Sequence, residues 1–378
     1  MLVEMIKKSN NSTQEINDLA PLVLARLSLT VITALIIFAS LTPFNFHLFT
    51  LNPFAWIAAP LPKYIPLFDV EVNVLGYLPL GFLTVFALFP RWVKWPAFIF
   101  SLLFGIILSA SLESAQTYLS TRVANLTDLY ANALGTFIGA LLAITIHPVW
   151  LSEQLTTRFR ITLKGKNQGI FLLLAIFPIA QIFPQNVWLG MGDFNLAFLR
   201  ISPYWSTLLN NTTQEVIIAA LAVISTSAFL MCGTSMQFPK IKVVFSIIFV
   251  GGVLKIAMSQ LQYGSFDIKH WISIANLAGV IIGFIGAIVI RNCSRVTQWV
   301  VALVGFILLL ILVNILPQNP YYLSQLQLLP QGRLTHFNGL LESITMIWPL
   351  LAIFLLTKQY KSFHDSFSAS SGVEVKQI

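Results

Sequence analysis

Long runs of apolar residues, separated by short polar segments, make up most of the chain. An α-helix needs roughly 18–20 apolar residues to cross a bilayer, and runs near or above that length recur from end to end. We therefore predict an all-α protein, a polytopic transmembrane helical bundle of about ten spans. The predicted spans lie at about 22–41, 72–89, 96–115, 127–147, 168–184, 213–232, 241–260, 271–290, 297–316 and 338–357.

The composition supports a membrane protein and argues against a soluble one. Hydrophobic residues form 57% of the chain, charged residues form 10%, and the mean hydropathy is +0.81. A soluble domain carries roughly 25% charged residues. The net charge of +8 is therefore interpreted loop by loop, as a topology signal, and we expect no nucleic-acid partner.

Lys and Arg gather on one side of the predicted spans, while few lie on the other side. The basic side of a membrane protein faces the cytoplasm, so we predict a multi-pass protein of the cell membrane with both termini cytoplasmic. Three segments then lie inside the cell: a tail at 1–21, a basic loop at 148–167 and a tail at 358–378. Lys255 is an exception, because it falls inside the seventh predicted span.

The chain also repeats itself weakly, with an offset of 144 residues. The segment ANALGTFIGALLA at 131–143 aligns with ANLAGVIIGFIGA at 275–287. A four-span unit at 22–147 therefore has a second copy at 168–290, followed by a two-helix half unit at 297–357. Four spans is an even number, so the two copies have the same orientation and form parallel repeats. The second copy has lost charge: Ala257 aligns with Glu113, and Ile272 aligns with Asp128.

Three polar motifs lie near the predicted outer ends of spans two, three and four. On each predicted helix the polar residues recur every three or four positions, so they share one helical face, while Arg122 hangs from the loop between spans three and four. The motifs supply eight candidate site residues: Asp69, Asn73, Ser109, Glu113, Gln116, Arg122, Asp128 and Asn132. We expect them to close one site, in which Arg122 reaches the acids. Three carboxylates against one guanidinium leave this site negative, so a protonated acid or a ligand bringing positive charge or a proton is expected.

Each motif also has a purely structural interpretation. Asp69 is suited to cap a helix, while Asn73 and Asn132 are suited to bond one helix to the next. Glu113 and Arg122 are suited to form a structural ion pair. Helix packing explains Pro79, Gly81, Gly135 and Gly139 better than ligand contact does. We expect no metal, no cofactor and no disulfide between the two cysteines, Cys232 and Cys293.

These motifs resemble the VanZ-like family over about residues 30–145. The matching pattern is D-x3-N-x3-Y-x-P-L-G-F, followed by S-x3-E-x2-Q-x5-R-x5-D-x3-N-x2-G. The sequence departs from the family at Thr127, where a second acid is common, and at Tyr77, where Phe is usual. The resemblance implies an integral membrane protein whose namesake gives resistance to the glycopeptide teicoplanin. It implies no particular reaction. The predicted architecture is therefore two parallel four-helix VanZ-like units and a two-helix half unit, in which only the first unit keeps the polar motifs.

Three classes of function remain open. The first is a binding protein of the cell envelope, whose outer site takes a lipid head group, a cell-wall precursor or a lipophilic glycopeptide. The second is a lipid or small-molecule transporter or flippase. The third is a membrane-embedded hydrolase or transferase that uses Glu113 and Asp128 as acid and base. Because G-x-S-x-G and H-E-x-x-H motifs are missing from the sequence, we rank binding first and assign no catalytic residue. Membrane lipids are the expected partners.

Overall fold

A computed structural model describes residues 23–42, 44–47, 52–61, 67–120, 122–146, 168–194, 211–234, 240–263, 272–318, 322–324, 327 and 335–371. The chain divides into two compact units, Met1–Gly165 and Lys166–Ile378. Helices dominate both units, and the described residues contain no sheet. The all-α prediction is therefore confirmed. The predicted tail at 1–21 and the whole of the predicted loop at 148–167 lie outside the described residues.

Nine helices of the described part are long and apolar enough to cross a membrane, which shows a multi-pass membrane protein. The first is Val23–Leu41. The others are α2 (Leu67–Leu88), α3 (Trp95–Gln116), α4 (Leu126–Thr145), α7 (Asn211–Gly233), α8 (Lys240–Tyr263), α10 (Ile274–Arg291), α11 (Arg295–Ile315) and α13 (Thr335–Ser371). All nine coincide with predicted spans to within a few residues, except that α13 continues well past 357.

The fifth predicted span, at 168–184, is shorter than the apolar pattern suggested. It forms α6 (Gln168–Ala180), a helix of 13 residues with Pro178 inside it. At 1.5 Å per residue this helix is only about 20 Å long, less than the ~30 Å hydrocarbon core. A proline near the helix end removes a backbone donor and favours termination. The count of ten full-length helical spans is therefore one too many for the described residues.

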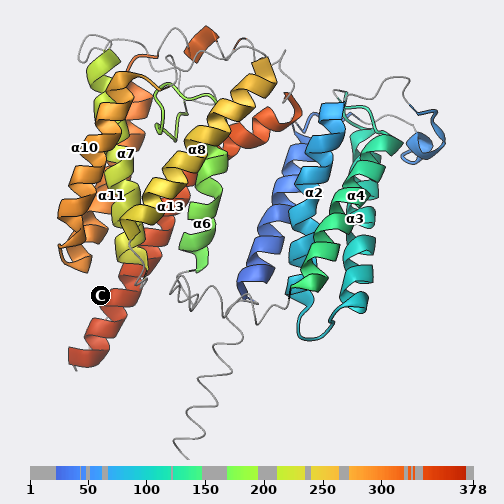
Figure 1. Ribbon diagram of the computed structural model, residues 1–378, viewed down its shortest axis with the longest axis horizontal. Coiled ribbons are helices and arrows are strands. Elements are labelled where there is room, and N and C mark those ends of the chain that lie inside the picture. The colour runs from blue at the N-terminus through green and yellow to red at the C-terminus, as the bar shows by residue number, and fades with distance from the viewer. Residues whose placement is uncertain are drawn as a thin grey trace, which may run out of the picture. The chain divides into compact units, whose positions relative to one another are not determined.

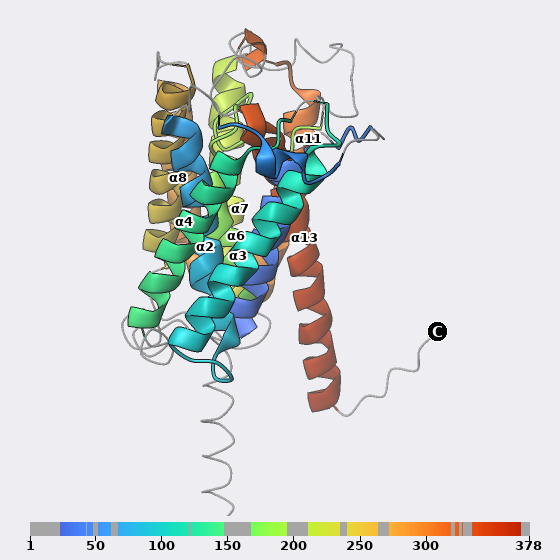
Figure 2. The same ribbon diagram turned by 90° about the vertical axis from the view of Figure 1, so that its right-hand side faces the viewer.

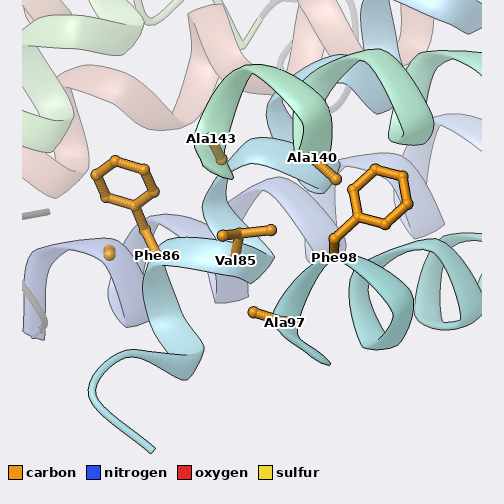
Figure 3. Packing of buried hydrophobic residues seen from close by; sticks show 7 residues of the cluster. Val85, Phe86, Ala97, Phe98, Ala140 and Ala143 are labelled. Carbon is orange, nitrogen blue, oxygen red and sulfur yellow. The ribbon is translucent and has the colours of Figure 1, made fainter. Parts of the chain in front are cut away.

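Unit 1 is a bundle of Val23–Leu41, α2, α3 and α4, which run side by side (Figure 1). One apolar cluster fills the bundle and joins α2, α3 and α4 through Val85, Phe86, Ala97, Phe98, Ala140 and Ala143, as Figure 3 shows. A second cluster joins the first helix to α2 and α3 through Ile36, Tyr77, Leu80 and Leu112. Burial of these apolar side chains holds unit 1 together.

Helices α2 and α4 cross at backbone contact distance. A Cβ atom added to Gly135 would overlap the carbonyl oxygen of Val74, and one added to Gly139 would overlap that of Leu78. A Cβ added to Gly81 would overlap the Thr136 carbonyl in the same way. Small residues allow this close approach, which brings the polar residues of the two helices within reach of each other.

The same glycine pairing occurs within unit 2, between α7 and α10. A Cβ added to Gly279 would meet the Val216 carbonyl, and one added to Gly283 would meet the side chain of Val223 and the carbonyl of Ala220. In both units, two glycines spaced by four residues face carbonyls spaced by four residues. This likeness supports the predicted repeat, although superposition of whole units stays a prediction.

Unit 2 differs from unit 1 in how its third helix packs. In unit 1, α3 packs on both α2 and α4, whereas the principal neighbour of α8 in unit 2 is the short helix α6. Helix α11 packs on α7, and the long helix α13 packs on α6 and α11; α13 is seen along its length in Figure 2. The chain after α6, from 181 to 194, is irregular and largely buried.

Candidate functional site

The candidate residues gather at one end of unit 1, where α2 begins, α3 ends and α4 begins. We call this end, with the last residues of Val23–Leu41, the polar end. The opposite part of the bundle is filled by the apolar cluster of Figure 3. The antiparallel course of the helices brings three motifs, which are separated in sequence, to the same end.

Asn73 of α2 and Asp128 of α4 bond directly across the helix contact. The Asn73 side-chain amide donates to Oδ1 of Asp128 over 3.1 Å. Asp69, exposed one turn before Asn73, lies near enough to act electrostatically on Asp128. Both acids are in the first turns of their helices, where the helix dipole favours negative charge.

Glu113 is buried at the end of α3, with 3% of its surface exposed. Its Oε2 accepts a hydrogen bond of 2.7 Å from the backbone N–H of Asn125. Asn125 in turn caps α4, because its side chain accepts from the N–H of Thr127. The Glu113 carboxylate is therefore fixed against the start of α4, in reach of the positive end of its dipole.

Arg122 hangs from the loop between α3 and α4, as predicted, and reaches inward. One guanidinium nitrogen donates to the carbonyl oxygens of Ala39, at 2.7 Å, and Thr42, at 3.3 Å. These carbonyls end the first helix, a place where a cation is favourable. Partial burial lowers the pKa of Arg122, while the nearby carboxylates of Asp128 and Glu113 act in the opposite direction. The structure thus brings Arg122 into the electrostatic range of both acids.

Gln116 points to the same helix end as Arg122. Its side-chain amide donates to the carbonyl oxygen of Ser40 over 3.0 Å, and the residue is 8% exposed. Gln116 and Arg122 therefore bind three carbonyls at the end of Val23–Leu41. Sequence reasoning missed these partners, because every residue has a backbone carbonyl and the sequence does not show which of them accepts a hydrogen bond from a side chain.

A smaller cluster lies one turn deeper and includes Tyr77, which follows Asn73 by four residues on the same face of α2. Asn132 donates to the Ser109 hydroxyl over 2.9 Å, and both residues are buried. Ser109 also lies beside the hydroxyl of Tyr77. In the described part of the chain, neither that hydroxyl nor Oδ1 of Asn132 has a hydrogen-bond partner. One buried donor and one buried acceptor are thus left open near Glu113.

The segment after the first helix folds over the end of α3. Phe46 and Leu119 form an isolated antiparallel bridge, and the backbone N–H of His47 donates to the Tyr118 carbonyl. The indole N–H of Trp56, in the short 3-10 helix η1 (Ala55–Ala58), donates to the Ser114 hydroxyl. Several apolar side chains of this segment are exposed, among them Phe44, Phe46, Phe54 and Ile57. Exposed apolar side chains beside membrane-spanning helices are expected to contact lipid.

All eight predicted site residues lie at the polar end or one turn below it. Within the described residues, no group of three or more His, Cys, Asp or Glu side chains is placed to hold a metal ion. The arrangement offers carboxylates, a guanidinium, amides and hydroxyls at close range. That these groups form a ligand site remains a prediction.

The apolar helices and the polar end define the class of the protein: a polytopic α-helical membrane protein with a polar cluster at one end of its first bundle. Residues 22–147, which form that bundle, match the family model described as VanZ/LLP1. This part of the chain is therefore a VanZ/LLP1 domain, and the resemblance seen in the motifs is confirmed. No curated protein and no solved structure matches the chain.

Proposed function

We propose that the VanZ/LLP1 domain binds the polar head of a membrane-inserted amphiphile at the polar end. The ligand is a lipid, a lipid-linked cell-wall precursor or a lipophilic glycopeptide. The observation that carries this proposal is the buried carboxylate of Glu113, set among other polar side chains at one end of an apolar bundle. Ionisable groups inside membrane segments are costly and usually serve a function.

The charges at the polar end favour a head group with positive charge or hydroxyl donors. Glu113 and Asp128 lie in electrostatic range of one guanidinium, and Asp69 lies near Asp128. That guanidinium already donates to two backbone carbonyls, so three ionised acids would leave the polar end negative. An ammonium or hydroxyl group of a ligand would offset the remaining negative charge. The open hydroxyl of Tyr77 and the open carbonyl oxygen of Asn132 would bind a ligand hydroxyl or amide.

The exposed aromatic residues beside the polar end support a ligand that arrives from the bilayer. Phe44, Phe46 and Phe54 place apolar rings at the surface next to the polar side chains. An amphiphile likewise has an apolar part beside a polar part, because its tail stays in the hydrocarbon while its head reaches the interface. A freely soluble ligand would gain nothing from these rings.

Binding is tested with the purified full chain in phosphatidylcholine nanodiscs. Two probes are titrated separately, teicoplanin and phosphatidylethanolamine, and thermal unfolding is followed by circular dichroism. At least one probe should raise the unfolding midpoint, because a ligand of the folded state stabilises it by mass action. Glu113→Gln should remove most of this shift, and Glu71→Gln, an exposed acid of α2, should leave it unchanged. Equal shifts in both variants, or no shift with either probe, would contradict the proposal.

Transport is the second candidate, and one observation favours it. Unit 2 combines the short helix α6 with a buried irregular segment at 181–194, a combination found at the substrate sites of secondary transporters. Lipid analysis of membranes with and without the protein distinguishes the two candidates. A transporter changes the sidedness of one lipid, whereas a binding protein changes neither its sidedness nor its structure.

A further inference from the structure

Lys255 lies inside unit 2 with 1% of its surface exposed. It belongs to the candidate span Lys240–Gln260 and stands five residues before the end of that span. At 1.5 Å per residue, it is about 8 Å inside. A basic side chain at this depth is costly and needs polar partners. The proposed function of unit 1 does not use this residue.

The amine of Lys255 contacts the chain where α6 has ended. Its Nζ donates to the carbonyl oxygens of Gln181 and Phe183, both at 3.2 Å. These carbonyls belong to the irregular segment 181–194, in which all residues except Ile182 and Phe194 are buried. Irregular backbone within a membrane protein is tolerated where protein covers it or where it lines a polar cavity.

Two further polar groups beside Lys255 have no hydrogen-bond partner in the described part of the chain. They are the side-chain carbonyl oxygen of Gln181 and the indole N–H of Trp188, and these residues are 0% and 6% exposed. Buried polar atoms are nearly always paired, so these two open groups need an explanation.

Gln181 and Trp188 both pack on α8 within about one helical turn of Lys255. The side chain of Gln181 packs against Gly251, and the ring of Trp188 packs against Gly252. Gly251 and Lys255 are four residues apart, so they stack on the same face of the helix. The two glycines thus admit the two side chains about one turn from the lysine along α8.

We propose that unit 2 binds an anionic group, a carboxylate or a phosphate, at Lys255, Trp188 and Gln181. The lysine supplies the positive charge, and the indole N–H supplies a neutral donor to a second oxygen. The carbonyl oxygen of Gln181 accepts from a hydroxyl or from a protonated acid oxygen. A cation would be repelled by the lysine, whereas an anion would be attracted to it. The anion is either free in solution or part of a lipid head group.

A purely structural role for Lys255 makes a different prediction. In that case the lysine only caps the carbonyls after α6, and Trp188 takes no part. Replacing Trp188 by Phe then removes an unpaired buried donor, which raises stability and changes nothing else. Under our proposal the same variant is also more stable without ligand, but it binds anions less tightly. Trp188→Phe therefore separates the two roles without removing the lysine.

The test uses the purified full chain in phosphatidylcholine nanodiscs, with thermal unfolding followed by circular dichroism. Sodium phosphate and sodium acetate are titrated at constant ionic strength against sodium chloride, and a parallel series replaces part of the phosphatidylcholine by phosphatidylglycerol. A midpoint raised by phosphate or acetate identifies a free anion as the source, and one raised only by phosphatidylglycerol identifies a lipid. Lys242→Met, at an exposed position of the same helix, is the matched control.

We expect Lys255→Met to weaken the apparent affinity by about tenfold or more, since a hydrogen bond to a charged group is lost. Trp188→Phe should weaken it by about threefold to tenfold, as for a neutral hydrogen bond. Lys242→Met should match the unaltered protein. If Lys255→Met does not fold, Trp188→Phe decides. The proposal is overturned if no anion shifts the midpoint, or if Trp188→Phe titrates like the unaltered protein.

Discussion

Asn73 of α2 donates a hydrogen bond to Asp128 of α4, and these two residues join the helices that Gly135 and Gly139 hold at contact distance. The bond therefore depends on the glycine contact, because larger residues would separate the backbones. Removing Asn73 leaves the Asp128 oxygen without this donor. We expect Asn73→Ala to lower the free energy of unfolding by about 0.5–1.5 kcal/mol, as for other polar pairs between membrane helices.

A double-mutant cycle of Asn73→Ala and Asp128→Ala measures this coupling in denaturant titrations of the purified protein. Additive effects would show that the two residues stabilise the helices independently. The control pair is Asn73 with Glu71, an exposed acid two residues away, for which we expect no coupling.

Close packing of α2 against α4 predicts that Gly139→Leu lowers the abundance of the protein. A side chain at this position overlaps the Leu78 backbone, which cannot yield as a flexible side chain would. Gly76 is the matched control, because a Cβ added there meets no atom within 4 Å. Membrane-fraction immunoblots should show Gly76→Leu near the unaltered level and Gly139→Leu several-fold below it. Similar levels for both variants would mean that the helices separate at little cost.

The repeat predicts that spans one to four superpose on spans five to eight, with Asn132 meeting Asn276 and Gly139 meeting Gly283. The glycine contacts of α7 with α10 support this alignment. In the second unit, Asn276 and Glu215 both contact the hydroxyl of Ser273, so a reduced polar cluster persists there. An experimental structure of the full chain tests the superposition, and unrelated positions for these helices would show that the likeness is confined to short apolar segments.

The charge distribution predicts the orientation of the polar end. Reporters fused within 43–68 and 117–126 should be extracytoplasmic, and those within 150–166 should be cytoplasmic. The short helix α6 comes after these loops, so it does not affect this prediction. A cytoplasmic signal from 117–126 would move the polar end to the inner face and would exclude ligands of the outer leaflet.

The lengths of the apolar runs predicted nine of the helices well. The thickness of the bilayer's hydrocarbon core sets a minimum length for a membrane-spanning helix, and the sequence shows that length directly. The same criterion failed at α6, since the apolar residues after Ala180 are buried by their own unit rather than by lipid. The spacing of the motifs predicted that the eight candidate residues lie at one end of the bundle, which is where the structure places them. It missed the carbonyls of Ala39, Ser40 and Thr42 and the backbone N–H of Asn125, because main-chain partners depend on tertiary packing alone.

The last prediction concerns Glu113 and Arg122, whose roles at the polar end are different. Glu113→Gln keeps an oxygen that accepts from the Asn125 N–H, so the start of α4 should stay in place while the ionisable carboxyl group is lost. Insertion and abundance should therefore be unchanged, and this variant should not rescue the phenotype of a strain that lacks the gene. Arg122→Ala removes the donors to Ala39 and Thr42 together with the only guanidinium predicted for the site. It should also fail to rescue, while still inserting in the membrane, and its free energy of unfolding should fall by about 1–3 kcal/mol.

Complementation by plasmid-borne variants, scored beside immunoblots of the membrane fraction, measures rescue and abundance for both variants. Full rescue by Glu113→Gln and Arg122→Ala would show that these residues only hold the helices together, because neither the charge nor the guanidinium would then be needed for activity.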